Sequence, residues 1–90
     1  MIWIFASKSD PEGGFGRAKS FAQTLNKNNQ SVTFVDRLSG RMPDLMKVAK
    51  HRIVRTPSVV VTRGERGHEL ARMMRIPAIH EIEKVMELCH

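Results

Sequence analysis

The chain has 90 residues, enough for one small domain and too few for a second. Apolar residues make up 41% and charged residues 27%, a mixture typical of a soluble globular domain and too apolar for a disordered chain. No apolar run approaches the length of a membrane-spanning helix, and the first residues lack the pattern of a signal peptide. We therefore expect a cytoplasmic protein without a membrane partner. The single cysteine, Cys89, excludes an internal disulfide and any CxxC motif.

Positive charge is concentrated in the middle of the chain. The formal net charge is +6, and residues 41–75 alone carry a net +6. Such a segment attracts polyanions, although a solvated surface on a basic protein is the simpler interpretation. One Trp, four Phe and no Tyr leave little material for stacking on bases. The residues that would contact a nucleic acid are Arg41, Lys47, Lys50, Arg52, Arg55, Arg63 and Arg66.

The first half of the chain alternates between strand and helix patterns. Residues 1–6 form a continuous apolar run, typical of a strand buried on both faces at the centre of a sheet. Residues 7–16 are polar and rich in Gly and Pro, which predicts a loop. A helix follows, because apolar residues then recur at helical spacing, and residues 31–36 predict a second strand. The stripe of that helix comprises Ala18, Phe21, Ala22 and Leu25.

The second half continues with a helix that begins at about Pro43, a strand at 58–62 and a turn at 63–67. Residues 68–74 can return as the antiparallel partner of strand 58–62, and Pro77 opens a last helix. The order β-α-β-α-β-β-α predicts an α/β fold with a four-stranded mixed sheet and three helices. Strands 31–36 and 68–74 are the expected edges, and they allow a monomer or a weak homodimer.

This order, with a proline directly before the third strand, resembles the thioredoxin-like superfamily. The resemblance covers nearly all of residues 1–90 as one domain. Its most specific part is Arg55-Thr56-Pro57-Ser58 leading into Val59–Val61, followed by a glycine turn, a strand and an amphipathic helix. The resemblance implies a cis Thr56–Pro57 bond, which an X–Pro peptide can adopt at small cost.

The chain departs from that family at the redox motif. The position of the family's CxxC is taken here by Gly14-Phe15-Gly16-Arg17, which has no thiol to activate. We therefore expect a redox-inactive protein that is not an enzyme, with no catalytic residue and no cofactor. Cys89 falls on the apolar stripe of the last helix and is predicted to be structural.

The resemblance implies a binding groove beside the proline turn. One side would consist of Gly14, Phe15, Gly16 and Arg17, and the other of Arg55, Thr56 and Pro57. We expect this groove to bind a protein segment of acidic character. Phe15 either anchors such a peptide or folds back onto the core. Phosphate or another anion could also lie at the glycine-rich helix start near Arg17 and Lys19, although dinucleotide and P-loop patterns are absent. A weaker alternative is a cofactor-using enzyme with glutathione or another small anion in the groove.

The remaining polar and sulfur-containing residues have simpler interpretations. Ser7, Ser9 and Asp10 follow the first strand and are expected to cap the next helix. The four histidines are scattered without metal-ligand spacing, so no metal site is predicted. Four of the five methionines at 42, 46, 73, 74 and 86 fit core positions of helices or strands, although methionines can also form an adaptable binding face.

Overall fold

The computed structural model describes residues 1–10, 13–36, 46–48, 50, 51, 53, 56–64 and 67–88. Its elements confirm the predicted order β-α-β-α-β-β-α, with the second helix represented by the helical residues 46–48 and 50. No helix within these ranges is long and apolar enough to cross a membrane. The other elements are β1 (Ile2–Ala6), α1 (Gly14–Lys27), β2 (Val32–Asp36), β3 (Ser58–Thr62), β4 (Glu69–Met73) and α3 (Ile79–Leu88).

The four strands form one mixed sheet in the order β2-β1-β3-β4. β1 is parallel to β2 and antiparallel to β3, and β4 returns antiparallel to β3. The two central strands are buried at every position, which explains why their sequences are continuous apolar runs rather than alternating ones. The predicted central place of β1 and the predicted edges β2 and β4 are confirmed.

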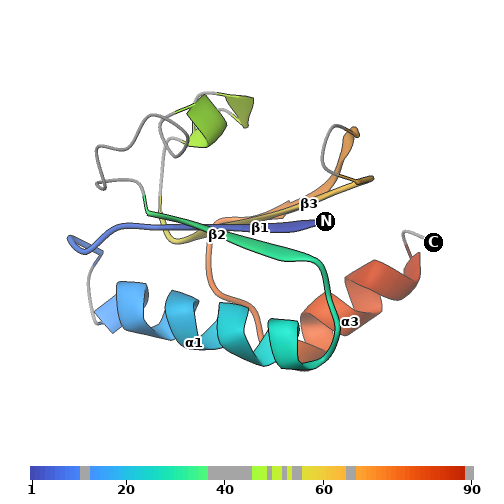
Figure 1. The fold of residues 1–90 in the computed structure, drawn as a ribbon, viewed down its shortest axis with the longest axis horizontal. Coiled ribbons are helices and arrows are strands. Elements are labelled where there is room, and N and C mark those ends of the chain that lie inside the picture. The colour runs from blue at the N-terminus through green and yellow to red at the C-terminus, as the bar shows by residue number, and fades with distance from the viewer. Residues whose placement is uncertain are drawn as a thin grey trace.

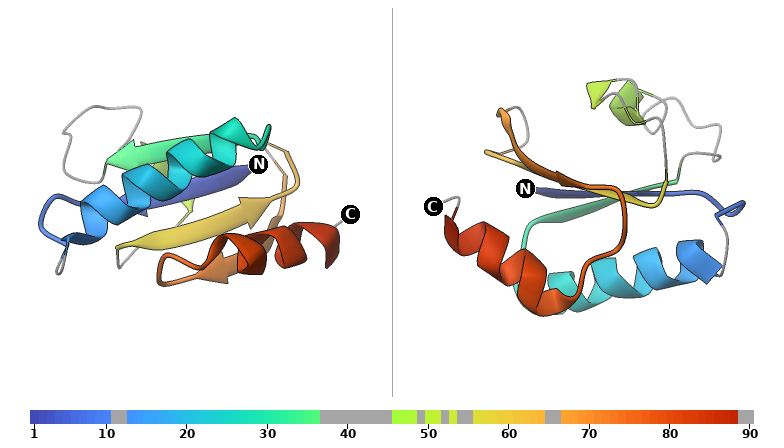
Figure 2. Two further views of the ribbon diagram at one scale, coloured as in Figure 1. Left: turned by 90° about the horizontal axis from the view of Figure 1, so that it is seen from below. Right: turned by 180° about the vertical axis from the view of Figure 1, so that it is seen from behind.

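Helices cover both faces of the sheet (Figures 1 and 2). α1 and α3 lie on one face, and the helical residues 46–48 and 50 lie on the other. We call these the α1 face and the His51 face. Successive side chains of a strand point to opposite faces, so each face has its own core. Ile4 and Val59 contribute to the α1-face core, whereas Trp3, Phe5 and Val60 contribute to the His51-face core.

The helix stripes agree with the prediction more closely than the helix ends. All four apolar residues of the α1 stripe are buried, and Ile82 is the buried centre of α3. However, α1 begins at Gly14, inside the stretch predicted as loop. Gly13 precedes it with a φ of 71°, a conformation that glycine adopts at little cost.

Two of the methionines do not occupy core positions. Met46 is 63% exposed and Met74 is 54% exposed, so the expectation that four of the five methionines are buried is wrong. In the 46–48 segment, Val48 rather than Met46 packs against the His51-face core. Met74 stands just beyond the end of β4. Met73 and Met86 do pack against the α1-face core, and Met42 lies outside the described residues.

Candidate functional site

The turn at Pro57 lies against the beginning of α1, as the predicted groove requires. The Thr56–Pro57 peptide bond is cis, which confirms the prediction. Gly14 is buried beside this turn: a Cβ atom on Gly14 would stand 3.8 Å from Cγ and Cδ of Pro57 and 3.0 Å from Cβ of Asp10. The contact with Pro57 would be an ordinary van der Waals distance, whereas Asp10 would have to shift by a few tenths of an ångström. Glycine at this position therefore lets Asp10 pack closely against the start of α1.

Asp10 fastens the proline turn to the loop that follows β1. Its Oδ2 accepts a hydrogen bond from the Ser7 amide at 2.8 Å, and its Oδ1 accepts one from the Thr56 hydroxyl at 2.5 Å. The hydroxyls of Ser7 and Ser9 lie 2.8 Å apart. The prediction that these residues cap α1 is wrong, because the N-cap is Gly13 and no side chain caps the helix. Asp10 reaches across 46 residues of sequence instead, a partner that local pattern cannot reveal.

A hollow of about 310 Å³ lies beside Pro57. Arg17 comes from α1, and Met74, Arg75 and Ile76 come from the connection between β4 and α3. This connection supplies a wall that the sequence analysis missed. The local signal for this wall was a pair of apolar residues, Met74 and Ile76, on either side of Arg75 in the connection before Pro77. The hollow therefore combines apolar side chains with two guanidinium groups.

The two arginines of the hollow have different surroundings. Arg75 forms an ion pair with Glu81 through both of its terminal nitrogens. These hydrogen bonds raise the pKa of Arg75 and lower the pKa of Glu81, whose carboxylate also accepts a bond from the Ala78 amide. Arg17 is exposed and has no ion-pair partner within the described part of the chain. It follows the first turn of α1, where no acidic residue offsets the positive end of the helix dipole.

Phe15 is not part of this hollow. Its ring packs edge-on against Phe34 of β2, with the ring centroids 5.5 Å apart, and it contacts the α1-face core. Of its two interpretations, folding back onto the core is therefore correct, and the assignment of Phe15 to the groove is not supported. Gly16 is exposed beside it, and Arg55 lies outside the described residues.

The residues predicted to contact a nucleic acid are only partly described. Lys47 and Lys50 lie on the His51 face, where the Lys47 ammonium stands 4.7 Å from the centre of the Trp3 ring. Arg63 is exposed in the turn after β3. Arg72 of β4 joins the lysines near His51, although it was not in the predicted set. Four others lie outside the described residues: Arg41, Arg52, Arg55 and Arg66.

The described residues contain no group of three metal-ligating side chains that could hold an ion. Cys89 lies outside these residues. Because the sequence contains a single cysteine, the chain has no CxxC pair.

No protein-family model and no curated protein matches the sequence. Among solved structures, thioredoxin 1 from the thermophilic eubacterium Thermosipho africanus TCF52B is similar, with a TM-score of 0.64 at 16% sequence identity. The match covers 98% of this chain and 91% of that one. At this identity the match shows the fold alone.

The chain thus has a thioredoxin-like fold that spans nearly its whole length. It lacks the pair of cysteines on which dithiol exchange depends.

Proposed function

We propose that the protein is a thioredoxin-like binding module without dithiol activity, and that the hollow beside Pro57 holds an acidic segment of another protein. The observation that carries this proposal is the lining of the hollow. Pro57, Met74 and Ile76 offer apolar surface next to the exposed guanidinium of Arg17. A segment with one apolar side chain beside a carboxylate complements both features.

The two kinds of contact have different roles. An exposed ion pair contributes at most about 1 kcal/mol, so the carboxylate mainly steers and orients the segment. The apolar side chain supplies most of the affinity by covering Met74 and Ile76. Arg75 is already paired with Glu81, so Arg17 is the arginine available to the ligand. A hollow of about 310 Å³ admits a single side chain, and we expect a transient complex with a micromolar dissociation constant.

The test uses fluorescence polarisation with labelled ten-residue peptides in which Asp and Glu alternate with Leu. Arg17→Glu should weaken binding at least tenfold, because it reverses the charge at the rim of the hollow. Lys27→Glu is the matched control, since Lys27 carries the same charge in the last turn of the same helix. If Arg17→Glu and Lys27→Glu bound the peptide with equal affinity, the peptide would not bind in this hollow.

Two further measurements separate this proposal from catalytic and small-anion alternatives. In an insulin-reduction assay, the protein should give no turnover above the dithiothreitol background, because no thiol pair is present. Turnover above that background would refute a non-redox role. Saturation-transfer NMR with glutathione tests the small-anion alternative. A signal that the acidic peptide fails to displace would favour that alternative over a protein segment.

A further inference from the structure

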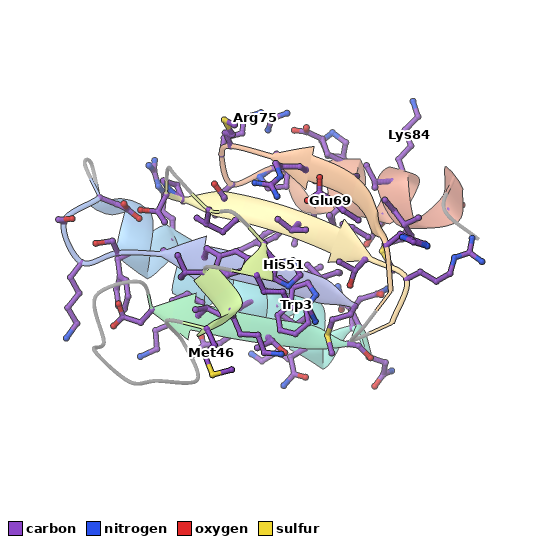
Figure 3. All side chains as sticks on the ribbon, turned by 90° about the horizontal axis from the view of Figure 1, so that it is seen from above. Trp3, Met46, His51, Glu69, Arg75 and Lys84 are labelled. Carbon is purple, nitrogen blue, oxygen red and sulfur yellow. The ribbon has the colours of Figure 1, made fainter. Side chains whose placement is uncertain are left out.

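His51 is buried at the end of the helical segment on the His51 face. It is 8% exposed, and its ring centroid lies 5.0 Å from that of Trp3 and 5.7 Å from that of Phe5. Figure 3 shows the imidazole directly above Trp3. The Nε2 atom is buried, and no hydrogen-bond partner for it exists among the described residues. The Nε2 edge of the imidazole is therefore held by packing against the rings and not by a hydrogen bond to any described residue.

The charged groups around the ring are mostly positive. Lys47 and Lys50 come from the segment of His51 itself, and Arg72 and Glu69 come from β4. Arg72 donates a hydrogen bond to the His51 carbonyl at 2.5 Å and is also paired with Glu69. Among the described residues, Glu69 is the carboxylate that acts on the imidazole, and it already has Arg72 as a cationic partner. From β1, the ring meets Trp3 and Phe5, which carry no charge.

Protonation of this imidazole destabilises the docked state, in which the segment packs on the sheet with His51 against Trp3 and Phe5. The pKa of His51 is lowered below its ordinary value of 6.5, mainly by burial and then by Lys50, Lys47 and Arg72, while Glu69 has a smaller opposite effect. If the segment left the sheet, the His51 ring would be exposed to water and its pKa would return to the ordinary value. Docking is therefore favoured at pH values above 6.5, and this advantage is lost as the pH falls towards the lowered pKa. Between the two pKa values, each pH unit changes the ratio of undocked to docked segment by up to about tenfold.

The opposite face of the sheet has a core of its own. The α1-face core is built from the sheet, α1 and α3, and it shares no residue with the His51-face core. Trp3 itself is anchored in β1, and its indole N–H donates to Thr62 Oγ1 at 2.9 Å. The segment can therefore leave while the sheet and the opposite layer persist, as in local unfolding.

We propose that His51 is an acid-sensitive latch: when its imidazole takes up a proton, the helical residues 46–48 and 50 leave the sheet together with His51 and uncover Trp3 and Phe5. Within the described part of the chain, the closed state is held by the two ring contacts, the Lys47 ammonium over Trp3, the Arg72 bond to the His51 carbonyl and the packing of Val48. When His51 leaves, its contacts with the Trp3 and Phe5 rings are lost.

The experiment uses Trp3, the only tryptophan of the chain and 1% exposed in the closed state. Acrylamide quenching of its fluorescence is measured from pH 8 to pH 5, with far-UV circular dichroism recorded in parallel. In the wild type, the quenching constant should rise at least threefold while the dichroism stays largely unchanged. His51→Phe keeps an aromatic ring without a titrating group and should abolish the rise. His80→Phe, at an exposed position of α3, should leave the rise intact.

The latch is refuted if His51→Phe shows the same rise, if the wild type shows none by pH 5, or if the rise accompanies complete loss of secondary structure. If His51→Phe fails to fold, hydrogen exchange of the wild type tests whether the segment opens at low pH. Corrected for intrinsic rates, the amide of His51, which donates to the Lys47 carbonyl at 3.0 Å, should lose protection at pH 5 while those of Phe21 to Leu25 in α1 keep it. Parallel loss of protection in both regions would also overturn the proposal.

Discussion

At the scale of single residues, the bond between Asp10 and Thr56 has the largest consequence for the candidate site. It joins the loop after β1 to the proline turn, and Gly14 closes against both. Neither partner shows this role in its sequence neighbourhood, since a short polar residue after a strand is most often expected to cap or turn. The shape of the Pro57 region thus depends on one hydrogen bond between distant segments.

We predict that Thr56→Val lowers the free energy of unfolding by about 1–2 kcal/mol, because it removes a hydroxyl donor to a carboxylate and keeps the side-chain shape. Urea denaturation measures this loss. Thr24→Val is the control, since the Thr24 hydroxyl only bonds the Ser20 carbonyl on the exposed side of α1. It should change stability by less than about 0.5 kcal/mol. Equal losses in the two variants would contradict a special role for the Asp10–Thr56 bond.

At the scale of elements, the start of α3 shows how charge fixes a helix end. Glu81 lies in the first turn, where its carboxylate accepts hydrogen bonds from the Ala78 amide and from Arg75. Both contacts favour the ionised form, so the pKa of Glu81 is lowered. The same ion pair places the guanidinium of Arg75 at the rim of the hollow. The helix start and the candidate site are therefore linked through one side chain.

The pH dependence of α3 follows from this arrangement. Because the pKa of Glu81 is lowered, its contribution to stability is present above 4.5, the ordinary value, and is lost as the pH falls further. We predict that Glu81→Gln lowers the melting temperature at pH 7 and that the gap to the wild type narrows towards pH 3. Glu83→Gln, at an exposed position of the same helix, should show a smaller gap. A gap for Glu81→Gln that stays constant with pH would argue against this ionic cap.

At the scale of the whole molecule, the net charge of +6 concerns partners more than the fold. Two groups of described cations lie where a partner could bind: Arg17 and Arg75 at the hollow, and Lys47, Lys50 and Arg72 on the His51 face. An acidic peptide in the hollow needs only the first group. A nucleic acid would need several cations at once.

Salt dependence therefore distinguishes these partners. We predict that double-stranded DNA binds only at low ionic strength and is released by about 150 mM salt, because non-specific binding to phosphates falls steeply with salt. Peptide binding should weaken far less, since most of its affinity comes from apolar contact. Gel shifts and polarisation over one salt series measure both. DNA binding that is tighter than peptide binding at 150 mM salt would make the nucleic-acid interpretation the better one.

Sequence by itself determined the order of the elements, the central place of β1 and the buried stripe of α1. Each of these follows from periodicity, because the spacing of apolar residues reports which positions of an element face away from water. The missing thiol pair is a fact of composition and was equally clear. The cis bond before Pro57 could be predicted only through the resemblance of the whole pattern to a known fold.

Tertiary structure alone decided what each side chain meets. It placed Phe15 on Phe34 rather than in the groove, gave Asp10 a partner 46 residues away and brought Met74, Arg75 and Ile76 beside Pro57. It also packed His51 against two aromatic rings of β1 and close to Arg72. Local pattern encodes the face that a residue occupies, whereas the partner across that face depends on how distant segments come together. The candidate hollow and the His51 latch both consist of such partnerships.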